Sequence, residues 1–219
     1  MAECVHLRPE DARRVPWKNG RGVTEELALW PAGASFERGD FDARISLSSV
    51  QEPGPFSPFP GFDRLLVVTR GGGLRLAHGG DVPPADVVRF RPHAVEGEWP
   101  TRAELPHGPV DDFNVIVRRG RLRVDVEVLS LAGGTGLGAV PLTIPTLEGW
   151  AAPVADAFVH LAEGHALVQV GGAGSPWPLG PRESLLVRGA GPGDRLRVTP
   201  ASRADAAAAV VLLVRLAGA

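Results

Sequence analysis

The stretch LLVVTRGGGL at residues 65–74 recurs in related form as FVHLAEGHAL at residues 158–167. When the two stretches are aligned, Gly71 lies over Gly164, and apolar residues flank both glycines at the same spacing. Each stretch is typical of a β-strand that ends in a tight turn and leads into a second strand. An internal repeat of this kind predicts two copies of one structural unit within the chain.

Two further segments extend the repeat on its C-terminal side. Residues 85–90 resemble residues 183–187 after a small gap, and residues 114–119 resemble residues 210–215. The copies differ in content, because the first carries the lysine, both asparagines and most of the phenylalanines, whereas the second has mainly aliphatic, Gly and Pro positions. We therefore expect a functional site in the first copy.

Short runs rich in Val and Leu continue on both sides of the repeat, separated by Gly and Pro. The 219-residue chain contains 28 Gly and 21 Pro, which favours many tight turns over long helices. The best helix candidate, residues 23–29, fits a strand equally well. The pattern predicts an all-β protein with two tandem β-barrels, a first domain at 1–130 and a second at 131–219, which form one compact unit and can exchange strands.

Composition and charge exclude several classes of protein. The chain is 44% hydrophobic and 22% charged, with a net charge of −2, so we expect a soluble globular protein that does not bind nucleic acid. Its one cysteine, Cys4, permits no internal disulfide, and the charged N-terminus does not resemble a signal peptide. The apolar run at 206–214 is too short to span a membrane and predicts a core strand. We expect a cytoplasmic location.

Rare residue types point to a site. Lys18 is the one lysine of the chain, and Asn19 and Asn114 are its two asparagines. These side chains depart from a composition that otherwise uses arginine for positive charge. Lys18 and Asn19 could supply a charge and an amide to a ligand, although the Asn-Gly pair at 19–20 also favours a simple turn.

A second group of residues fits the recognition of a small carboxylate. Arg44 and Ser46 are two residues apart and project from one face of a predicted strand, and Arg64 begins the strand at 65–68. Arginine grips a carboxylate through two charge-assisted hydrogen bonds, and Phe56 and Phe59 could exclude water from such a site. The alternative is that these arginines form structural ion pairs at the rim of the barrel.

Carboxylate and amide side chains complete the candidate site. Asp112 and Asn114 are also two residues apart and share a face, and Glu26 is the expected countercharge of Lys18. Asn114 could instead satisfy backbone groups at the end of a strand. An enzyme, an isomerase or hydrolase, could use Glu26 or Asp112 as a base and Lys18 as an acid.

The sequence does not favour a metal site or a cofactor. It contains no His-x-His pair, and the looser combinations of His93 with Glu98 and of Glu104 with His107 lack the usual number and spacing of ligands. Phosphate-binding and dinucleotide-binding motifs are also missing. We therefore expect no metal and no cofactor.

Three long segments carry a family resemblance, and they are WKNGRGVTEELALWP (17–31), FDARISLSSVQEPGPFSPFPGFDRLLVVTRGGGLRL (41–76) and FRPHAVEGEWPTRAELPHGPVDDFNVIVRRGR (90–121). In order and spacing they closely resemble the HutD/Ves family of bacterial proteins. The resemblance implies a double-barrel cupin fold, a bicupin of RmlC-like jelly rolls. It also implies a link to histidine utilisation or stress response, through binding of a small acidic metabolite such as urocanate or formylglutamate.

The chain departs from the family pattern at three positions. Arg21 replaces a glycine, Glu25 replaces an arginine, and Ala43 replaces a tryptophan, whereas Glu26, Arg44 and Ser46 match. The reversed charge at Glu25 could change ligand specificity. The main hypothesis is a metal-free protein that binds a small carboxylate and modulates histidine utilisation. The alternatives are an enzyme that uses the same residues and a protein-interaction module with a vestigial pocket, and each could form a homodimer.

Overall fold

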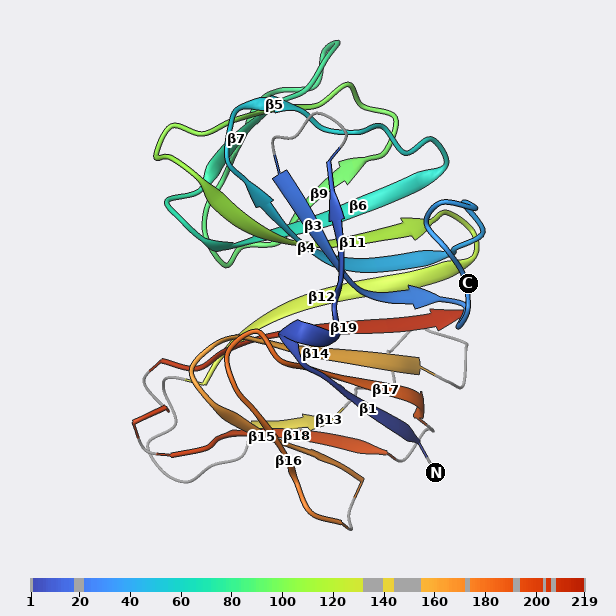
Figure 1. Ribbon diagram of the computed structural model, residues 1–219, viewed down its shortest axis with the longest axis vertical. Coiled ribbons are helices and arrows are strands. Elements are labelled where there is room, and N and C mark those ends of the chain that lie inside the picture. The colour runs from blue at the N-terminus through green and yellow to red at the C-terminus, as the bar shows by residue number, and fades with distance from the viewer. Residues whose placement is uncertain are drawn as a thin grey trace. The chain divides into compact units, whose positions relative to one another are not determined.

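A computed structural model describes residues 2–17, 22–131, 140–143, 155–171, 174–190, 194–202, 204–205 and 208–218. Its contacts divide the chain into two compact units (Figure 1). We call Ala12–Leu122 the first unit, and Met1–Asp11 together with Arg123–Ala219 the second unit. The division into domains at 1–130 and 131–219 stays a prediction. None of the helical structure in the described ranges is long and apolar enough to cross a membrane.

The first unit consists of two antiparallel sheets, one of six strands and one of four. The larger sheet has the order β2 (Arg13–Pro16), β3 (Gly22–Trp30), β4 (Ala43–Val50), β11 (Val110–Arg118), β6 (Phe62–Arg70) and β9 (His93–Glu96). The smaller sheet has the order β5 (Gly54–Pro55), β10 (Arg102–Glu104), β7 (Leu74–Ala77) and β8 (Ala85–Val87).

The second unit also consists of two sheets, which have five and four strands. The larger has the order β1 (Glu3–Leu7), β17 (Ser184–Ala190), β14 (Ala155–Glu163), β19 (Val210–Gly218) and β12 (Leu122–Ser130). The smaller has the order β13 (Val140–Thr143), β18 (Arg195–Pro200), β15 (Ala166–Val170) and β16 (Trp177–Leu179). The helical structure in the described residues is limited to 3-10 geometry, at η1 (Pro9–Asp11) and at Asp205, so the prediction of an all-β chain is confirmed.

The sequence repeat corresponds to a repeat of strand pairing. In the first unit, β6 pairs with β11 and β9 and then leads into β7 of the smaller sheet. In the second unit, β14 pairs with β19 and β17 and leads into β15 in the same way. The aligned glycines form both turns, with φ of 95° at Gly71 and 73° at Gly164, a region that favours glycine. The two-copy prediction is confirmed.

Two of the sequence matches have the wrong register. The match of residues 85–90 to 183–187 is wrong because β8 pairs with β7, so that its counterpart is β16, which pairs with β15. The match of 114–119 to 210–215 is displaced by three residues. Asn114 lies opposite Leu66, and Leu213 lies opposite Val159, which aligns with Leu66 in the repeat. Short aliphatic strands resemble one another at several registers, and an odd shift exchanges the two faces of a strand.

Strand alternation decides which side chains face the interior of the first unit. Residues 23–29, the helix candidate, form part of β3, whose burial alternates along the strand. One apolar cluster joins the larger sheet to the smaller one, through Val50, Leu66, Val68 and Val110 on one side and Leu74, Leu76, Val87 and Ala103 on the other. Side chains in phase with Val50 and Leu66 therefore point inward.

Candidate functional site

Polar side chains cover part of the inward face of the larger sheet in the first unit. Ser46 and Ser48 are in phase with Val50 on β4, and cross-strand pairing places Asn114 opposite Ser46 and Asp112 opposite Ser48. We call the whole set the inner polar face. It comprises Thr24, Glu26, Arg44, Ser46, Ser48, Arg64, Asp112 and Asn114. These side chains are buried, with the exception of Arg64, whose side chain is 12% exposed.

Arg44 and Glu26 form a buried ion pair in this face. The Nε atom of Arg44 donates a hydrogen bond of 2.9 Å to Oε2 of Glu26, and the two side chains are only 6% and 7% exposed. The guanidinium lies 4.1 Å from the ring centre of Phe36. Burial lowers the pKa of Arg44, and the charge of Glu26 opposes this change. Arginine nevertheless keeps its proton at neutral pH.

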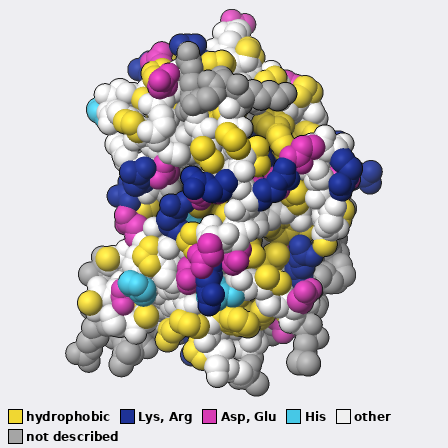
Figure 2. Space-filling model, viewed as in Figure 1, with side chains coloured by type: hydrophobic (Ala, Val, Ile, Leu, Met, Phe, Trp, Pro, Cys, Tyr) yellow, Lys and Arg dark blue, Asp and Glu magenta, His cyan; other side chains and the backbone are white. Residues whose placement is uncertain are grey.

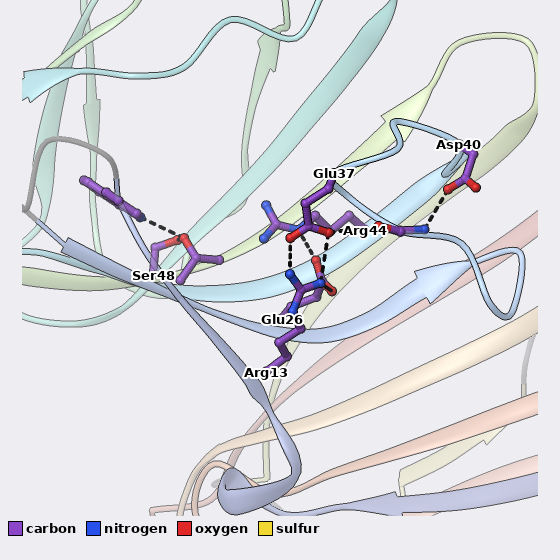
Figure 3. A network of polar contacts seen from close by, with 9 residues as sticks. Arg13, Glu26, Glu37, Asp40, Arg44 and Ser48 are labelled. Carbon is purple, nitrogen blue, oxygen red and sulfur yellow. Dashed lines mark hydrogen bonds and ion pairs between the residues drawn. The ribbon is translucent and has the colours of Figure 1, made fainter.

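The buried pair continues into an ion-pair network toward solvent. Figure 3 shows Arg13, Glu26, Glu37 and Arg44 pointing toward one another from β2, β3, β4 and the loop after β3. Arg13 lies 3.6 Å from Glu26 and donates hydrogen bonds to the carboxylate of Glu37. Glu26 was expected to balance Lys18. Lys18 lies outside the described residues, so this pairing stays a prediction. Among the described residues Glu26 pairs with Arg13 and Arg44, because β2 and β4 flank β3 at this position.

Arg64 has a different environment on the same face. Its Nε atom donates a hydrogen bond of 2.7 Å to Oδ1 of Asn114, and its Nη2 atom bonds the same oxygen. The guanidinium lies 4.1 Å from the ring centre of Phe56, which therefore covers it as the sequence suggested. Burial lowers the pKa of Arg64. Its closest carboxylate oxygen, Oδ2 of Asp112, is 3.7 Å away, so a neutral amide accepts its short hydrogen bonds.

Asp112 is the most deeply buried ionisable group of this face. It has no exposed surface, and the Nδ2 atom of Asn114 donates a hydrogen bond of 2.7 Å to its Oδ1 atom. Its Oδ2 atom is buried and accepts no hydrogen bond from any described residue. Burial raises the pKa of Asp112, while the charge of Arg64 opposes the rise.

The two arginines converge on one region of the interior. Ile116 lies opposite Arg44 on one neighbouring strand and opposite Arg64 on the other, so the three form a row across the sheet. Besides burial, the charge of Arg44 lowers the pKa of Arg64, as expected for two cations on one face of a sheet. Each guanidinium has five N–H donors. Arg44 donates one hydrogen bond and Arg64 two to the described residues, so most of these donors have no acceptor there.

Hydroxyl groups line the neighbouring end of the inner polar face. The Nε1 atom of Trp17 donates a hydrogen bond of 2.8 Å to Oγ1 of Thr24, which lies 3.2 Å from Oγ of Ser48. Lys18 and Asn19 follow Trp17 directly, but both lie outside the described residues. Their part in the site stays a prediction.

Phe59 contacts Phe36, the ring that covers the guanidinium of Arg44. Its ring belongs to an aromatic cluster with Phe36, 6.1 Å away, and Phe62, 6.5 Å away. At the start of β6, Asp63 forms an ion pair with Arg119. On the face shown in Figure 2, basic and acidic side chains lie next to one another in the same manner.

Sequence reasoning missed four members of the site, namely Arg13, Thr24, Phe36 and Ser48. Period-two alternation could have found Thr24 from Glu26 and Ser48 from Ser46. Arg13 and Phe36 reach the site through strand pairing and a loop, for which the sequence has no local signal.

Two residues of the loose metal combinations have other partners. His93 stacks on His78, with 6.2 Å between ring centres, while Glu98 binds Arg119. Across the ranges that the structure describes, no group of three or more His, Cys, Asp and Glu side chains could hold a metal ion.

Three members of this polar set have apolar counterparts in the second unit. The counterparts of Arg64, Asp112 and Asn114, by strand pairing, are Ala157, Val211 and Leu213. All three counterparts belong to the apolar core of the second unit. The polar set therefore distinguishes the first copy of the repeat, where the sequence predicted the site.

Comparison with solved structures identifies the fold of the whole chain. A conserved protein of unknown function from Pseudomonas aeruginosa PAO1 matches with a TM-score of 0.79 and 26% identity, over 99% of this chain and 100% of that one. HutD from Pseudomonas fluorescens SBW25 matches with a TM-score of 0.73, 26% identity and the same coverage. Oxalate decarboxylase from Lactobacillus farciminis matches with a TM-score of 0.61 and 8% identity. The match covers 96% of this chain and 85% of the decarboxylase chain, and it supports the bicupin fold.

Sequence comparison identifies the family. An uncharacterized 21.2 kDa protein in the hutC 3′ region of Pseudomonas putida is 35% identical over 127 residues, which is 58% of this chain and 65% of that protein. Protein Ves of Cronobacter sakazakii is 35% identical over 130 residues, covering 58% of this chain and 68% of Ves. The chain thus spans about two thirds of the length of these relatives. The HutD family model matches residues 9–206, and the chain belongs to the HutD family.

Proposed function

We propose that the first unit binds a small carboxylate between Arg44 and Arg64. The observation that carries this proposal is the presence of two guanidinium groups on one face, that of Arg44 buried and that of Arg64 largely shielded, most of whose N–H donors find no acceptor among the described residues. An anion between two such cations would reduce their mutual repulsion. A carboxylate accepts paired N–H bonds from arginine and so matches the available chemistry.

The surroundings strengthen the proposed interaction. Phe36 and Phe56 each cover one guanidinium, and both arginine side chains are largely shielded from water. Charge-assisted hydrogen bonds are stronger where water is excluded. Glu26 already pairs with Arg44, whereas Arg64 has only a neutral amide at hydrogen-bond distance. Arg64 is therefore the primary anchor in this proposal, and Arg44 the secondary one.

The names of relatives suggest the biological setting. One relative is named for its place in the hutC 3′ region, and the family itself is named HutD. We infer a role in histidine utilisation, with urocanate or formylglutamate as the type of carboxylate that is bound. In this role the protein acts as a metal-free binding protein that modulates the pathway rather than as one of its enzymes.

A thermal-shift screen with urocanate, formylglutamate, histidine and acetate tests the proposal. At about 100 times its dissociation constant, a ligand that binds only the folded state adds about 2.7 kcal/mol to its stability. We expect a clear shift for the wild type and little or none for Arg64→Lys, which keeps the charge but loses the planar fork.

Arg70→Lys is the matched control. Arg70 pairs with Asp111 and is 70% exposed, so its replacement should leave the ligand-induced shift intact. Failure of every acid to stabilise the wild type would refute carboxylate binding. An equal ligand-induced thermal shift in the wild type and in Arg64→Lys would show that Arg64 does not bind the ligand.

A further inference from the structure

Asp112 offers an acceptor that the carboxylate proposal leaves unused. Its Oδ2 atom is fully buried and receives no hydrogen bond from any residue in the described part of the chain. A buried carboxylate oxygen without a donor costs free energy, and native proteins rarely keep one without a reason. The residue lies on the inner polar face, where cross-strand pairing sets it between Ser48 and Val68.

The neighbours of Asp112 hold its side chain in place but use only one of its two oxygens. Asn114 donates to Oδ1 at 2.7 Å, and this same amide accepts the hydrogen bonds of Arg64 through its own oxygen. These contacts, which run from Arg64 through Asn114 to Asp112, therefore fix the position of the Asp112 carboxylate and leave its Oδ2 atom without a hydrogen bond from the described residues. The Nη2 atom of Arg64 lies 3.7 Å from Oδ2, beyond hydrogen-bond distance.

Unused donors and an unused acceptor thus lie side by side. Arg64 and Arg44 present N–H groups that have no acceptor among the described residues. Oδ2 of Asp112 has no donor among them, and it lies 3.7 Å from Nη2 of Arg64. A simple carboxylate would satisfy only the arginines. A ligand that also carries an N–H group a few bonds from its carboxylate would satisfy both.

We propose that Asp112 determines specificity by accepting a hydrogen bond from an N–H group of the ligand, so that the site selects carboxylates that also carry an N–H donor. This inference rests on the proposed carboxylate site and names the class of ligand more narrowly. A site built to bond an N–H group discriminates strongly against an analogue that lacks it, because the buried oxygen is then left unpaired.

Two acids of matched shape test this inference by calorimetry. Urocanate, which is 3-(imidazol-4-yl)acrylate, carries a ring N–H group. 3-(Furan-2-yl)acrylate has a similar outline without a nitrogen donor. We expect the wild type to bind the imidazole acid at least about tenfold more tightly than the furan acid. In Asp112→Asn the ratio should fall to about one, because the amide can turn its own N–H group toward the ligand.

Asp111→Asn is the matched control, because it removes the same charge one residue away. Asp111 pairs with the exposed Arg70, so this variant should keep the wild-type ratio. Equal binding of the two acids by the wild type would overturn the inference while leaving the carboxylate site intact. This comparison needs no variant, so it remains decisive even if Asp112→Asn does not fold. If neither acid binds the wild type, the carboxylate site fails, and the inference with it.

Discussion

At the scale of single residues, Glu26 is predicted to stabilise the first unit through its buried pair with Arg44. Both side chains are less than a tenth exposed and lie 2.9 Å apart. Replacing Glu26 with Gln leaves the arginine buried without its charge partner, which typically costs about 3–5 kcal/mol. Urea unfolding of Glu26→Gln should show a loss of this size. Asp111→Asn breaks an exposed pair and should cost less than about 1 kcal/mol. Equal losses would show that burial adds nothing to the Glu26 pair.

Much of the site could be predicted from single residues and their spacing. Alternation along a strand correctly put Arg44 on one face with Ser46, and Asp112 on one face with Asn114. The candidate site placed these two pairs together, but alternation along a strand cannot show that they meet, because this depends on the pairing of β4 with β11, which are far apart in the sequence. The same limitation applies to the pairing of Glu26 with Arg13 and Arg44, which lie on the neighbouring strands β2 and β4.

At the scale of elements, we predict that Gly97 is needed because the loop that carries Phe56 and Phe59 packs closely against its backbone. A Cβ atom at this position would lie 2.0 Å from the backbone oxygen of Phe59 and 2.5 Å from that of Phe62. The same backbones are joined by hydrogen bonds, from Phe59 to Gly97 at 2.8 Å and from Gly97 to Phe62 at 2.9 Å. A side chain must therefore push the loop away and break this pairing.

We expect Gly97→Ala to lower the free energy of unfolding by about 1–3 kcal/mol, the usual cost of forcing extra atoms into a packed site. Gly54→Ala is the control, since Gly54 lies in β5 with nothing within 4 Å of an added Cβ. Chemical denaturation of both variants measures the difference. A Gly97→Ala protein as stable as Gly54→Ala would mean that the loop moves without cost.

At the scale of the whole molecule, the two copies of the repeat keep one pattern of strand pairing but differ in their interiors. Gly and Pro at turns, together with apolar runs, carry the fold, and for this reason the sequence predicted two all-β copies. The correct register between the copies was harder to predict, because Asn114 aligns with Leu213 rather than with the similar run at Val210. Once the register is known, the polar interior of the first unit stands out against the apolar core of the second.

The second unit has a buried histidine that should make its stability depend on pH. His160 is 1% exposed, and its Nδ1 atom lies 2.9 Å from Oγ of Ser184. Burial, followed by the charge of Arg182, lowers the pKa of His160 to about 3 from the usual 6.5. Between these values the unfolded chain binds a proton on this ring and the folded chain does not. Stability therefore increases with pH across this window and is lost as the pH falls below 6.5.

His160→Asn removes this titration while keeping a polar group beside Ser184. We expect the free energy of unfolding of the wild type, relative to the variant, to fall by up to about 1.4 kcal/mol for each pH unit below 6.5. Urea unfolding between about pH 7 and pH 5 measures this difference, and carboxylates that titrate in both proteins cancel from it. His107, an exposed side chain, provides the control His107→Asn, in which the buried ring of His160 is unchanged, so the fall in stability below pH 6.5 should remain. If the difference in free energy of unfolding between the wild type and His160→Asn stays constant with pH, the ring binds protons equally well in the folded and unfolded chains.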